Sequence, residues 1–315
     1  MEKRKLGTTD IMVSPLCFGG NVFGWTIDEQ QSHKLLDAVT DAGINFIDTA
    51  DVYSTWAHGG EGGQSETIIG NWIKKSGKRD SVIIATKVGK EMGPGKKGLS
   101  KAYITKAVED SLRRLQTDYI DLYQSHDDDQ ETPFEETLSA FGDLIKQGKV
   151  RAIGASNYGA QRLQESLEVS RKNNLPAYQT LQPLYNLYDR EVYEKELEAV
   201  CVENGLGVIN FYALASGFLT GKYRTQEDLA TTRRQSNKKY FNERGFKILK
   251  GLDDVAAQYN ANPAQVAIAW LIARPSIGAP IASATSIEQL QDLIKATELK
   301  LDNNAIGIIN KASAW

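Results

Sequence analysis

Cysteine and histidine are scarce in this chain of 315 residues, which has two of the first and three of the second. The two cysteines, Cys17 and Cys201, form no CxxC pair and are too few for a disulfide framework. We expect both thiols to be buried and inert, because a free cysteine packs as a small apolar side chain. A chain without disulfides is typical of a reducing compartment, so we expect a cytoplasmic protein.

Long apolar runs and an excess of one charge are also missing. Lys and Arg number 37 against 40 Asp and Glu, a net charge of −3, which lacks the basic footprint of a nucleic-acid-binding protein. No apolar run approaches the roughly 20 residues that cross a bilayer, and the first segment, MEKRKLGTTD, is too polar for a signal peptide. With no heptad pattern either, we expect a monomer that acts on a small molecule and has no nucleic-acid or membrane partner.

Short β-rich apolar runs alternate along the chain with amphipathic helical stretches. The runs predict eight strands, at residues 14–18, 45–48, 82–86, 120–124, 152–155, 178–182, 207–212 and 277–281. The intervening helices are expected to begin near Asp28, Ser65, Ser100, Pro133, Gly159, Arg190, Pro263 and Ser286.

This alternation predicts a parallel sheet covered by helices. Eight units without a reversal point favour a closed (β/α)8 (TIM) barrel over an open sheet. A hairpin of residues 4–6 with 11–13 is expected to cap the lower end of the barrel, and an extra helix near residues 304–311 to follow it. We therefore predict a single α/β domain that spans residues 1–315.

Two long segments break the alternation of strands and helices. Residues 51–64 are rich in glycine and follow the second strand, whereas residues 220–242 are polar and basic and follow the seventh. Long loops in a compact domain are usually functional or disordered. Both follow the carboxyl ends of strands, where barrel enzymes build their sites.

Four side chains that can exchange or hold protons stand just past three successive apolar runs. Asp48 and Tyr53 lie in NFIDTADVY, Lys87 ends SVIIATK, and His126 ends YIDLYQSH. A phenol is a poor acid near pH 7, but a nearby ammonium favours its ionised form and a carboxylate can hold that ammonium in place. An imidazole beside them can donate a hydrogen bond to a carbonyl oxygen. Such a set is what the reduction of a carbonyl group needs beside a hydride donor.

Several longer segments carry a family resemblance in the same order along the chain: GINFIDTADVYS, GGQSETIIGNWI, GKVRAIGASNY, LQPLYNLYDRE and FYALASGFLTGKY. From about Lys5 to about Leu301 the chain resembles the aldo-keto reductases, (β/α)8-barrel enzymes that use a nicotinamide cofactor. The resemblance implies that Tyr53 exchanges a proton with the substrate and that Lys87, paired with Asp48, lowers the pKa of the phenol. His126 would orient and polarise the carbonyl group.

The resemblance also implies a cofactor site along the barrel rim. Ser156, Asn157 and Gln182 would hold the carboxamide, Tyr212 would stack on the nicotinamide ring, and Gln289 would contact the adenine. The full expected set is Asp48, Ser156, Asn157, Gln182, Tyr212, Ala213, Leu214, Ala215, Gly217, Leu219, Gly221, Lys222, Ser283, Thr285, Ser286 and Gln289. The resemblance implies NADPH as the cofactor. Serine and threonine stand where the family usually has a cation for the 2′-phosphate, so NADH is an alternative. The basic segment 224–239 is a further candidate to fold over the cofactor.

The chain departs from the family directly after His126, where Asp127, Asp128 and Asp129 replace the usual aromatic residue. Three carboxylates beside an imidazole raise the alternative of a metal site, although a solvated acidic loop is favoured and no metal is predicted. Acidic residues here should disfavour anionic substrates. Candidates for the substrate pocket are Phe23, Trp25, Trp56 and Tyr158, whose rings suit aldehydes, ketones or the apolar face of a sugar.

Three other interpretations stay open. The glycine pattern GPGKKG at residues 93–98 resembles a dinucleotide fingerprint only weakly, because a proline lies inside it and a true fingerprint belongs in the first βα turn of a Rossmann unit. Lys87 at a strand end could instead form a Schiff base, as in a lyase. The same fold also serves as a nucleotide-binding regulatory subunit, because fold alone does not determine function.

Overall fold

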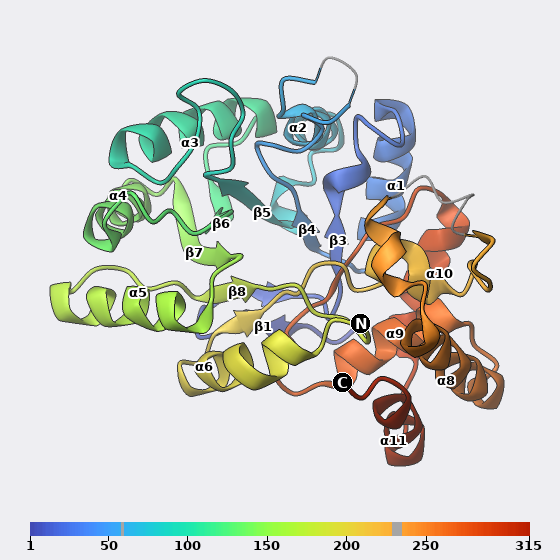
Figure 1. Cartoon of the computed structure of the whole chain (residues 1–315). Helices are drawn as coiled ribbons and strands as arrows, with labels where there is room; N and C mark the ends of the chain where they lie inside the picture. The colour runs from blue at the N-terminus through green and yellow to red at the C-terminus, as the bar shows by residue number, and fades with distance from the viewer. Residues whose placement is uncertain (58–59, 229–234) are drawn as a thin grey trace.

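The structure, a computed structural model, describes residues 1–57, 60–228 and 235–315. Its main element is a sheet of eight parallel strands in the order β10-β3-β4-β5-β6-β7-β8-β9 (Figure 1). These strands are β3 (Cys17–Gly19), β4 (Phe46–Asp48), β5 (Ile83–Val88), β6 (Ile120–Ser125), β7 (Val150–Ser156), β8 (Thr180–Gln182), β9 (Gly207–Val208) and β10 (Ile281–Ala282).

Backbone hydrogen bonds between the two outer strands of this order close the sheet. The carbonyl oxygen of Val208 in β9 accepts from the N–H groups of Gly278 and Ala279, at 2.9 and 3.2 Å, just before β10. The N–H group of Ile281 donates to the carbonyl oxygen of Asn210 at 2.9 Å. The predicted (β/α)8 barrel is therefore confirmed, and closure leaves no open edge on which a further strand could pair.

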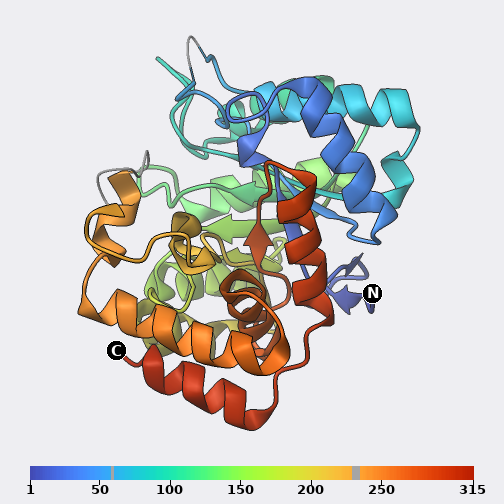
Figure 2. The ribbon, with the colours of Figure 1, turned by 90° about the vertical axis from the view of Figure 1, so that its right-hand side faces the viewer.

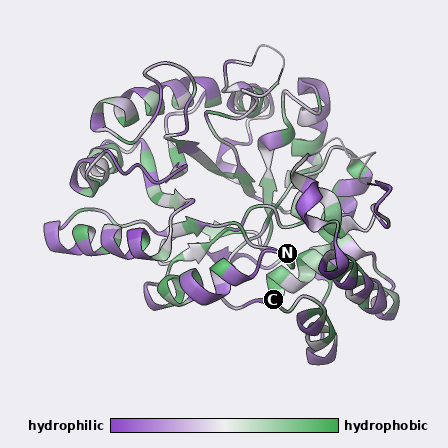
Figure 3. Ribbon diagram, in the orientation of Figure 1, coloured by the Kyte–Doolittle hydropathy of each residue, from purple (hydrophilic) through white to green (hydrophobic). Residues whose placement is uncertain are grey.

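Helices surround the barrel, and most of them contain both apolar and polar residues, as the mixed colouring in Figure 3 shows. The helices are α1 (Glu29–Asp41), α2 (Gln64–Ser76), α3 (Lys101–Leu115), α4 (Phe134–Lys146), α5 (Ala160–Asn173), α6 (Glu198–Glu203), α8 (Glu243–Tyr259), α9 (Pro263–Ala273), α10 (Ile287–Glu298) and α11 (Asn303–Ala312). One π-helical turn, η3 (Tyr193–Leu197), leads into α6. Short 3-10 turns are η1 (Gly20–Val22), η2 (Arg79–Ser81), η4 (Ala215–Thr220) and η5 (Gln235–Tyr240). No helix in the described ranges is long and apolar enough to cross a membrane.

Side-chain caps explain where several helices begin. The side chains of Asp28, Ser100 and Ser286 each accept a hydrogen bond from a backbone N–H in the first turn of α1, α3 and α10. Asn262 and Gln265 form a reciprocal capping box at the start of α9. These caps supply partners for N–H groups that have none inside the helix, so the predicted starts at these positions are confirmed.

One helix was not predicted, and several strands have other bounds than predicted. No helix was expected between residue 242 and Pro263, yet α8 fills this interval, capped by Asn242. The eighth strand was expected at residues 277–281, but β10 comprises Ile281–Ala282. The seventh strand was expected to run to residue 212, but β9 ends at Val208. Beyond it Phe211 makes only an isolated bridge to Leu184, and the positive φ of Tyr212, 57°, turns the chain out of the sheet.

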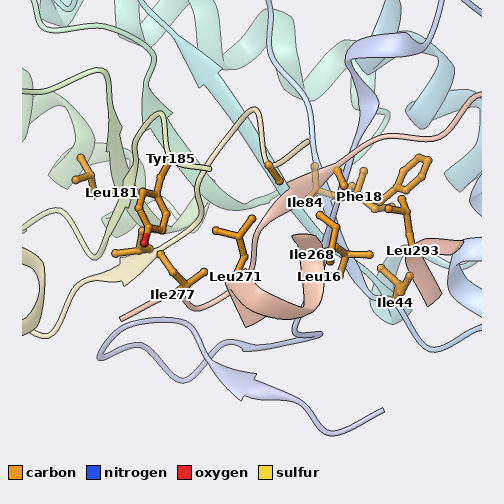
Figure 4. Close-up of a cluster of buried hydrophobic side chains, with 14 of the residues drawn as sticks. Leu16, Phe18, Ile44, Ile84, Leu181, Tyr185, Ile268, Leu271, Ile277 and Leu293 are labelled. Carbon is orange, nitrogen blue, oxygen red and sulfur yellow. The ribbon is translucent and has the colours of Figure 1, made fainter. Parts of the chain in front are cut away.

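The apolar core has an inner and an outer part. Inside the barrel, side chains from alternating strand positions such as Phe46, Ala85 and Leu122 pack together. The outer layer lies between the strands and the helices, where Figure 4 shows Ile84 and Leu181 of the sheet with Leu271 of α9 among the buried side chains. Cys17 and Cys201 are both buried and unpaired, as expected.

A hairpin closes the amino-terminal end of the barrel. Its strands β1 (Arg4–Lys5) and β2 (Met12–Val13) pair antiparallel, and Leu6 and Ile11 enter the inner core. Gly7, with φ of 59°, lies so close to the backbone before β8 that a Cβ atom there would clash with the carbonyl oxygen of Gln179. Figure 2 shows the hairpin on the opposite side of the barrel from the turns around η5. The other rim of the barrel is thus left open for a site.

Candidate active site

Neighbouring strands carry the four predicted residues to one rim of the barrel. Asp48 is the last residue of β4, Lys87 lies near the end of β5, and His126 directly follows β6. In the parallel register Asp48 pairs with Ala85 and Lys87 pairs with Gln124. Because these strands are adjacent and point the same way, side chains at their carboxyl ends lie close together.

A compact set of hydrogen bonds joins three of the four residues. The Nζ atom of Lys87 donates to Asp48 Oδ2 at 2.7 Å, to the carbonyl oxygen of Thr49 at 2.7 Å and to the Tyr53 hydroxyl at 2.8 Å. Tyr53 in turn donates to Asp48 Oδ2 at 3.0 Å. An ammonium has three protons, so the fully buried Lys87 has a partner for each of them.

The phenol of Tyr53 is a weak acid. Burial and the negative charge of Asp48 raise the pKa of Tyr53 well above its usual value. The ammonium of Lys87 lies 2.8 Å from the hydroxyl, and burial lowers the pKa of Lys87 itself. The expected contribution of Lys87, a lowering of the phenol pKa, stays a prediction. Tyr53 keeps its proton near neutral pH and is available as an acid.

His126 is a neutral imidazole beside this set, with its ring centre 6.0 Å from that of Tyr53. Burial, Lys87 and Lys90 lower its pKa well below the usual value, because all three disfavour a positive charge. Its Nδ1 atom is buried and has no hydrogen-bond partner in the described part of the chain. Burial without a partner costs less free energy for an Nδ1 atom that carries no proton than for an Nδ1–H donor. This difference favours the tautomer with its proton on Nε2. That proton can be donated to an oxygen of a ligand.

Further polar residues continue from Asp48 across the mouth of the barrel. Gln182 at the end of β8 donates to Asp48 Oδ1 at 2.9 Å, and Ser156 at the end of β7 donates to the carbonyl oxygen of Gln182 at 3.0 Å. Asn157 donates to the carbonyl oxygen of His126 at 2.8 Å. Gln182 and Asn157 thus contact the proton-transfer residues directly, and Ser156 is linked to them through Gln182.

The segment after β9 supplies a ring and a strained turn. Tyr212 is 44% exposed at the rim, and its backbone is held by Asn186, which donates to the Tyr212 carbonyl oxygen at 3.1 Å. Ala215, Ser216 and Gly217 all have positive φ values. The N–H groups of Ala215 and Gly217 donate to the carbonyl oxygens of Tyr212 and Leu214 at 2.7 and 2.8 Å, so hydrogen bonds of the backbone hold this turn in place.

The residues around this turn divide into buried and accessible ones. Ala213, Ala215 and Leu219 are buried, whereas Leu214 and Gly217 are partly exposed. Lys222 is exposed, and its Nζ lies 3.3 Å from the position that a Cβ atom on Gly217 would take. Gly221, with φ of 76°, ends η4. Lys222 is therefore placed to add a positive charge beside the turn.

The start of α10 is a self-contained cap. Ser286 accepts a hydrogen bond from Gln289 N, and Gln289 Oε1 accepts from Thr285 N at 2.9 Å. Ser283 donates to Asn21 Oδ1 at 2.6 Å. From Ser283 to Gln289 the sequence contains no lysine or arginine. The residues predicted to contact the adenosine end of the cofactor thus lie in one short segment. That segment has no arginine that could bind a 2′-phosphate.

Two of the four aromatic residues proposed for the substrate pocket reach the surface near Tyr53. Trp25 and Trp56 are 43% and 49% exposed, pack edge to face with ring centres 5.7 Å apart, and Trp56 lies 5.9 Å from Tyr53. Phe23 is fully buried, and Tyr158 is 3% exposed with its hydroxyl against that of Tyr178. Phe23 and Tyr158 offer a ligand almost no surface, so their place in the pocket stays a prediction.

The acidic run after His126 is bound into the protein. Asp127 pairs with Lys90 at 3.1 Å, and Asp128 accepts two hydrogen bonds of 2.9 Å from Arg162. Asp129 accepts from several groups, among them the N–H of Leu99 at 2.7 Å, and these bonds lower its pKa. The described residues include no group of three or more side chains suited to a metal ion. These contacts favour a structural role for the run over a metal site.

A polar groove of about 680 Å³ lies between the loop after β5 and the loop that contains this acidic run. Its lining includes Val52, next to Tyr53, and residues 97–98 of the weak glycine pattern. That pattern forms tight turns, with Met92 N bonded to Lys96 O and Gly98 N bonded to Gly89 O. It neither follows a strand directly nor opens a helix, which argues against a dinucleotide fingerprint.

Parts of the two long segments lie outside the described residues, namely 58–59 and 229–234. The described ends of the second one are held by ion pairs, Arg224 with Asp253 and Lys239 with Asp189. The prediction that residues 224–239 fold over a cofactor therefore stays a prediction.

Sequence reasoning missed two residues that adjoin the predicted set. Gln124 in β6 lies 3.4 Å from Gln182 Nε2, and its own Nε2 is buried without a partner among the described residues. Asp51 is buried between Asp48 and Tyr53 in the chain, again with no partner for its side chain. The only signal for either was a polar residue inside an otherwise apolar or strand-end segment.

A closed (β/α)8 barrel with ionisable side chains at the carboxyl ends of adjacent strands defines a class of proteins that hold their active sites at this rim. Within that class, the chain belongs to the aldo/keto reductase family, whose model matches residues 15–314.

Named relatives of similar length include both enzymes and subunits of a channel. The chain is 36% identical to an uncharacterized oxidoreductase, YrpG, of Bacillus subtilis (strain 168), over 98% of this chain and 95% of the relative. It is 31% identical to the L-glyceraldehyde 3-phosphate reductase of Escherichia coli (strain K12), over 94% and 87%. It is also 34% identical to a probable voltage-gated potassium channel subunit beta of Oryza sativa subsp. japonica, over 95% and 92%.

Proposed function

We propose that the protein reduces aldehydes or ketones to alcohols, reversibly, with a nicotinamide cofactor as the hydride donor. The observation that carries this proposal is the hydrogen-bonded set of Asp48, Lys87 and Tyr53 with a neutral His126 beside it. This arrangement holds a proton at one defined oxygen atom, the hydroxyl of the partly buried Tyr53. Carbonyl reduction needs such a proton when negative charge develops on the substrate oxygen.

Each residue has a distinct task in this reaction. Tyr53 donates its proton to the carbonyl oxygen, and the Lys87 ammonium, 2.8 Å away, stabilises the phenolate that remains. Asp48 accepts from both Lys87 and Tyr53 and so keeps the two in place. His126 donates from Nε2 to the same carbonyl oxygen and withdraws electron density from the carbon. When bound, the cofactor supplies the hydride that this carbon receives.

The residues that would hold the cofactor fit its parts. Ser156, Asn157 and Gln182 offer donors and acceptors to a carboxamide, and the exposed ring of Tyr212 offers a flat surface to the nicotinamide. The exposed ammonium of Lys222, beside the turn at residues 215–217, offers a positive charge to the pyrophosphate. We propose NADPH, as the family resemblance implies, and NADH remains an alternative because no cation stands between Ser283 and Gln289.

The substrate is proposed to enter beside Trp25 and Trp56, the exposed pair next to Tyr53. Their rings offer an apolar wall to an aldehyde, a ketone or the face of a sugar. The polar groove next to Val52 can take a hydroxylated end of such a molecule. A small carbonyl or sugar-like compound therefore fits both surfaces.

The two rival functions are less well supported by the residues of the site. A Schiff-base lyase needs an accessible amine, but Lys87 is fully buried and all three of its protons are in hydrogen bonds. A regulatory subunit needs a nucleotide site but not a proton donor. Its case rests on relatives such as the one from rice, while the complete proton-transfer set favours turnover.

The proposal is tested by cofactor binding and turnover in one protein preparation. NADPH and NADH are titrated against the fluorescence of the five tryptophans, and their oxidation is then followed with a panel of aldehydes and ketones. Tyr53→Phe should lower kcat by about a hundredfold or more while Kd for the cofactor stays within about twofold, because only the proton donor is lost.

Tyr119→Phe is the matched control, because this phenol lies at the surface, where it donates to Asp80. It should leave both quantities unchanged. Turnover in Tyr53→Phe at the wild-type rate would refute the assigned proton donor. Tight cofactor binding without turnover on any carbonyl compound would favour the regulatory function.

A further inference from the structure

Asp51 is a buried carboxyl group that the reaction proposed above does not use. It lies between Asp48 and Tyr53 in the chain and is 1% exposed. Both of its carboxyl oxygens are buried without a hydrogen-bond partner in the described part of the chain. Its backbone N–H donates to the carbonyl oxygen of Lys87 at 3.3 Å. The backbone of Asp51 is therefore hydrogen-bonded to Lys87, the residue whose ammonium lies in the site.

The charges around Asp51 are already balanced without it. The ammonium of Lys87 is paired with Asp48 at 2.7 Å. The guanidinium of Arg114 is paired with Glu66 at 2.7 Å, and the other oxygen of Glu66 accepts from Thr86 at 2.5 Å. A third buried carboxylate would have no cation of its own, and only the backbone N–H of Val52 lies near enough to favour its charge, without forming a regular hydrogen bond. Because such a charge is costly to bury, the carboxyl group stays protonated near neutral pH.

Asp51 faces titratable or charged groups on each element packed around it, namely Lys87 of β5, Glu66 of α2, Arg114 and Tyr103 of α3, and Tyr123 of β6. Burial and the nearby Glu66 raise the pKa of Asp51 to about 8, although Arg114 and Lys87 act in the opposite direction. Asp51 therefore gains its negative charge only in alkaline solution. That charge in turn raises the pKa of Lys87.

We propose that Asp51 is a positioning residue that acts through Lys87. Near neutral pH the side chain of Asp51 is uncharged and leaves the charge balance of Asp48, Lys87 and Tyr53 intact. In alkaline solution it is a carboxylate and helps to keep protons on Lys87 and Tyr53. This inference rests on the proposed reductase function. A new negative charge raises the proton affinity of the groups that it faces. Lys87 and Tyr53 share a hydrogen bond and titrate as a pair, so either one transmits the effect.

The test compares pH profiles of carbonyl reduction by the wild type, Asp51→Asn and Asp254→Asn from about pH 6 to about pH 10 at constant ionic strength. Asp254→Asn is the matched control, because it makes the same change at an exposed residue of α8 that pairs only with Lys250. The amide of Asn resembles the protonated carboxyl group in shape and never ionises. Below about pH 7, kcat of Asp51→Asn should equal that of the wild type.

In alkaline solution the two profiles should separate. The alkaline limb of Asp51→Asn should lie at a pH about half a unit lower, the size expected for one charge acting across the protein interior. At a pH on this limb, reduction by Asp51→Asn should then be about threefold slower than in the wild type. Oxidation of the alcohol, which needs the phenolate, should begin at a correspondingly lower pH. A merely structural defect would instead lower the rates by the same factor at every pH.

Superimposable profiles of Asp51→Asn and an active wild type would overturn the inference. Failure of Asp51→Asn to fold would overturn it too, because an amide should replace a neutral carboxyl group at this place. A folded wild type that binds cofactor but turns over no carbonyl compound would overturn the proposed function itself. The failure of the inference and that of the function can therefore be told apart.

Discussion

Replacement of Asp51 by asparagine should stabilise the protein, and the gain should grow as the pH rises. In the folded protein the pKa of this carboxyl group is about 8, whereas its ordinary value is 3.8. Between these two values the folded state holds a proton that the unfolded state releases. The unfolded state thus binds fewer protons, so the free energy of unfolding falls as the pH rises through this range.

The size of the effect follows from the span between the two pKa values. Each pH unit contributes about 1.4 kcal/mol, so a span of about four units sets an upper bound of about 6 kcal/mol at pH 8 and above. Local relaxation around a buried charge reduces such penalties, and we expect a gain of about 2–4 kcal/mol for the variant. Near pH 4 the difference between the two proteins should be small, because this pH is close to the ordinary pKa of 3.8 and the stability of the wild type has only begun to fall.

Urea unfolding of the wild type, Asp51→Asn and the control Asp254→Asn at several pH values between about 4 and 9 measures this difference. The slope of the unfolding free energy against denaturant concentration should be the same in all three, since the surface exposed on unfolding does not change. A stability difference for Asp51→Asn that is constant with pH would refute the argument, because it would mean that Asp51 has the same charge in the folded and unfolded states.

Three further changes test the site. Lys87→Met should abolish turnover and lower the free energy of unfolding by about 3–5 kcal/mol, because Asp48 would keep a buried charge without its partner; a stable variant in urea unfolding would contradict this. Ser283→Arg should raise the preference for NADPH over NADH by placing a guanidinium at the start of α10, and an unchanged ratio of KM values would count against it. Trp56→Ala should raise KM for aromatic aldehydes by about tenfold with kcat nearly unchanged; equal KM values would exclude Trp56 from the substrate wall.

The arrangement of strands and helices could be predicted because its signals are local. Apolar runs with polar residues at their ends mark the strands, and caps such as Asp28 and Ser100 mark the helix starts. The helix α8 was not predicted, because the long polar segment 220–242 was expected to be followed by a helix only near Pro263. Its cap, Asn242, and an apolar face with Leu249 and Leu252 were present in the sequence.

The acidic run shows why local sequence is a poor guide to electrostatics. In the sequence, Asp127 to Asp129 predicted either three solvated charges or a metal site. In the structure, each of these carboxylates has a hydrogen-bond or ion-pair partner on a segment distant in the chain. Arg162 lies in α5 and contacts Asp128, and the N–H of Leu99 comes from the loop before α3. We therefore expect a weaker repulsion of anionic substrates, because Lys90 and Arg162 offset part of the negative charge of this run.

By itself the sequence determined the family, the barrel and the identity of the residues that can move a proton. These follow from residue types and from their spacing along one chain. Only the tertiary structure decided the protonation states. Tyr53 keeps its proton because burial and the charge of Asp48 raise its pKa, and Asp51 does so because the nearby cations already have partners. A pKa depends on burial and on every charge nearby in space, and neither quantity can be read from positions in the chain.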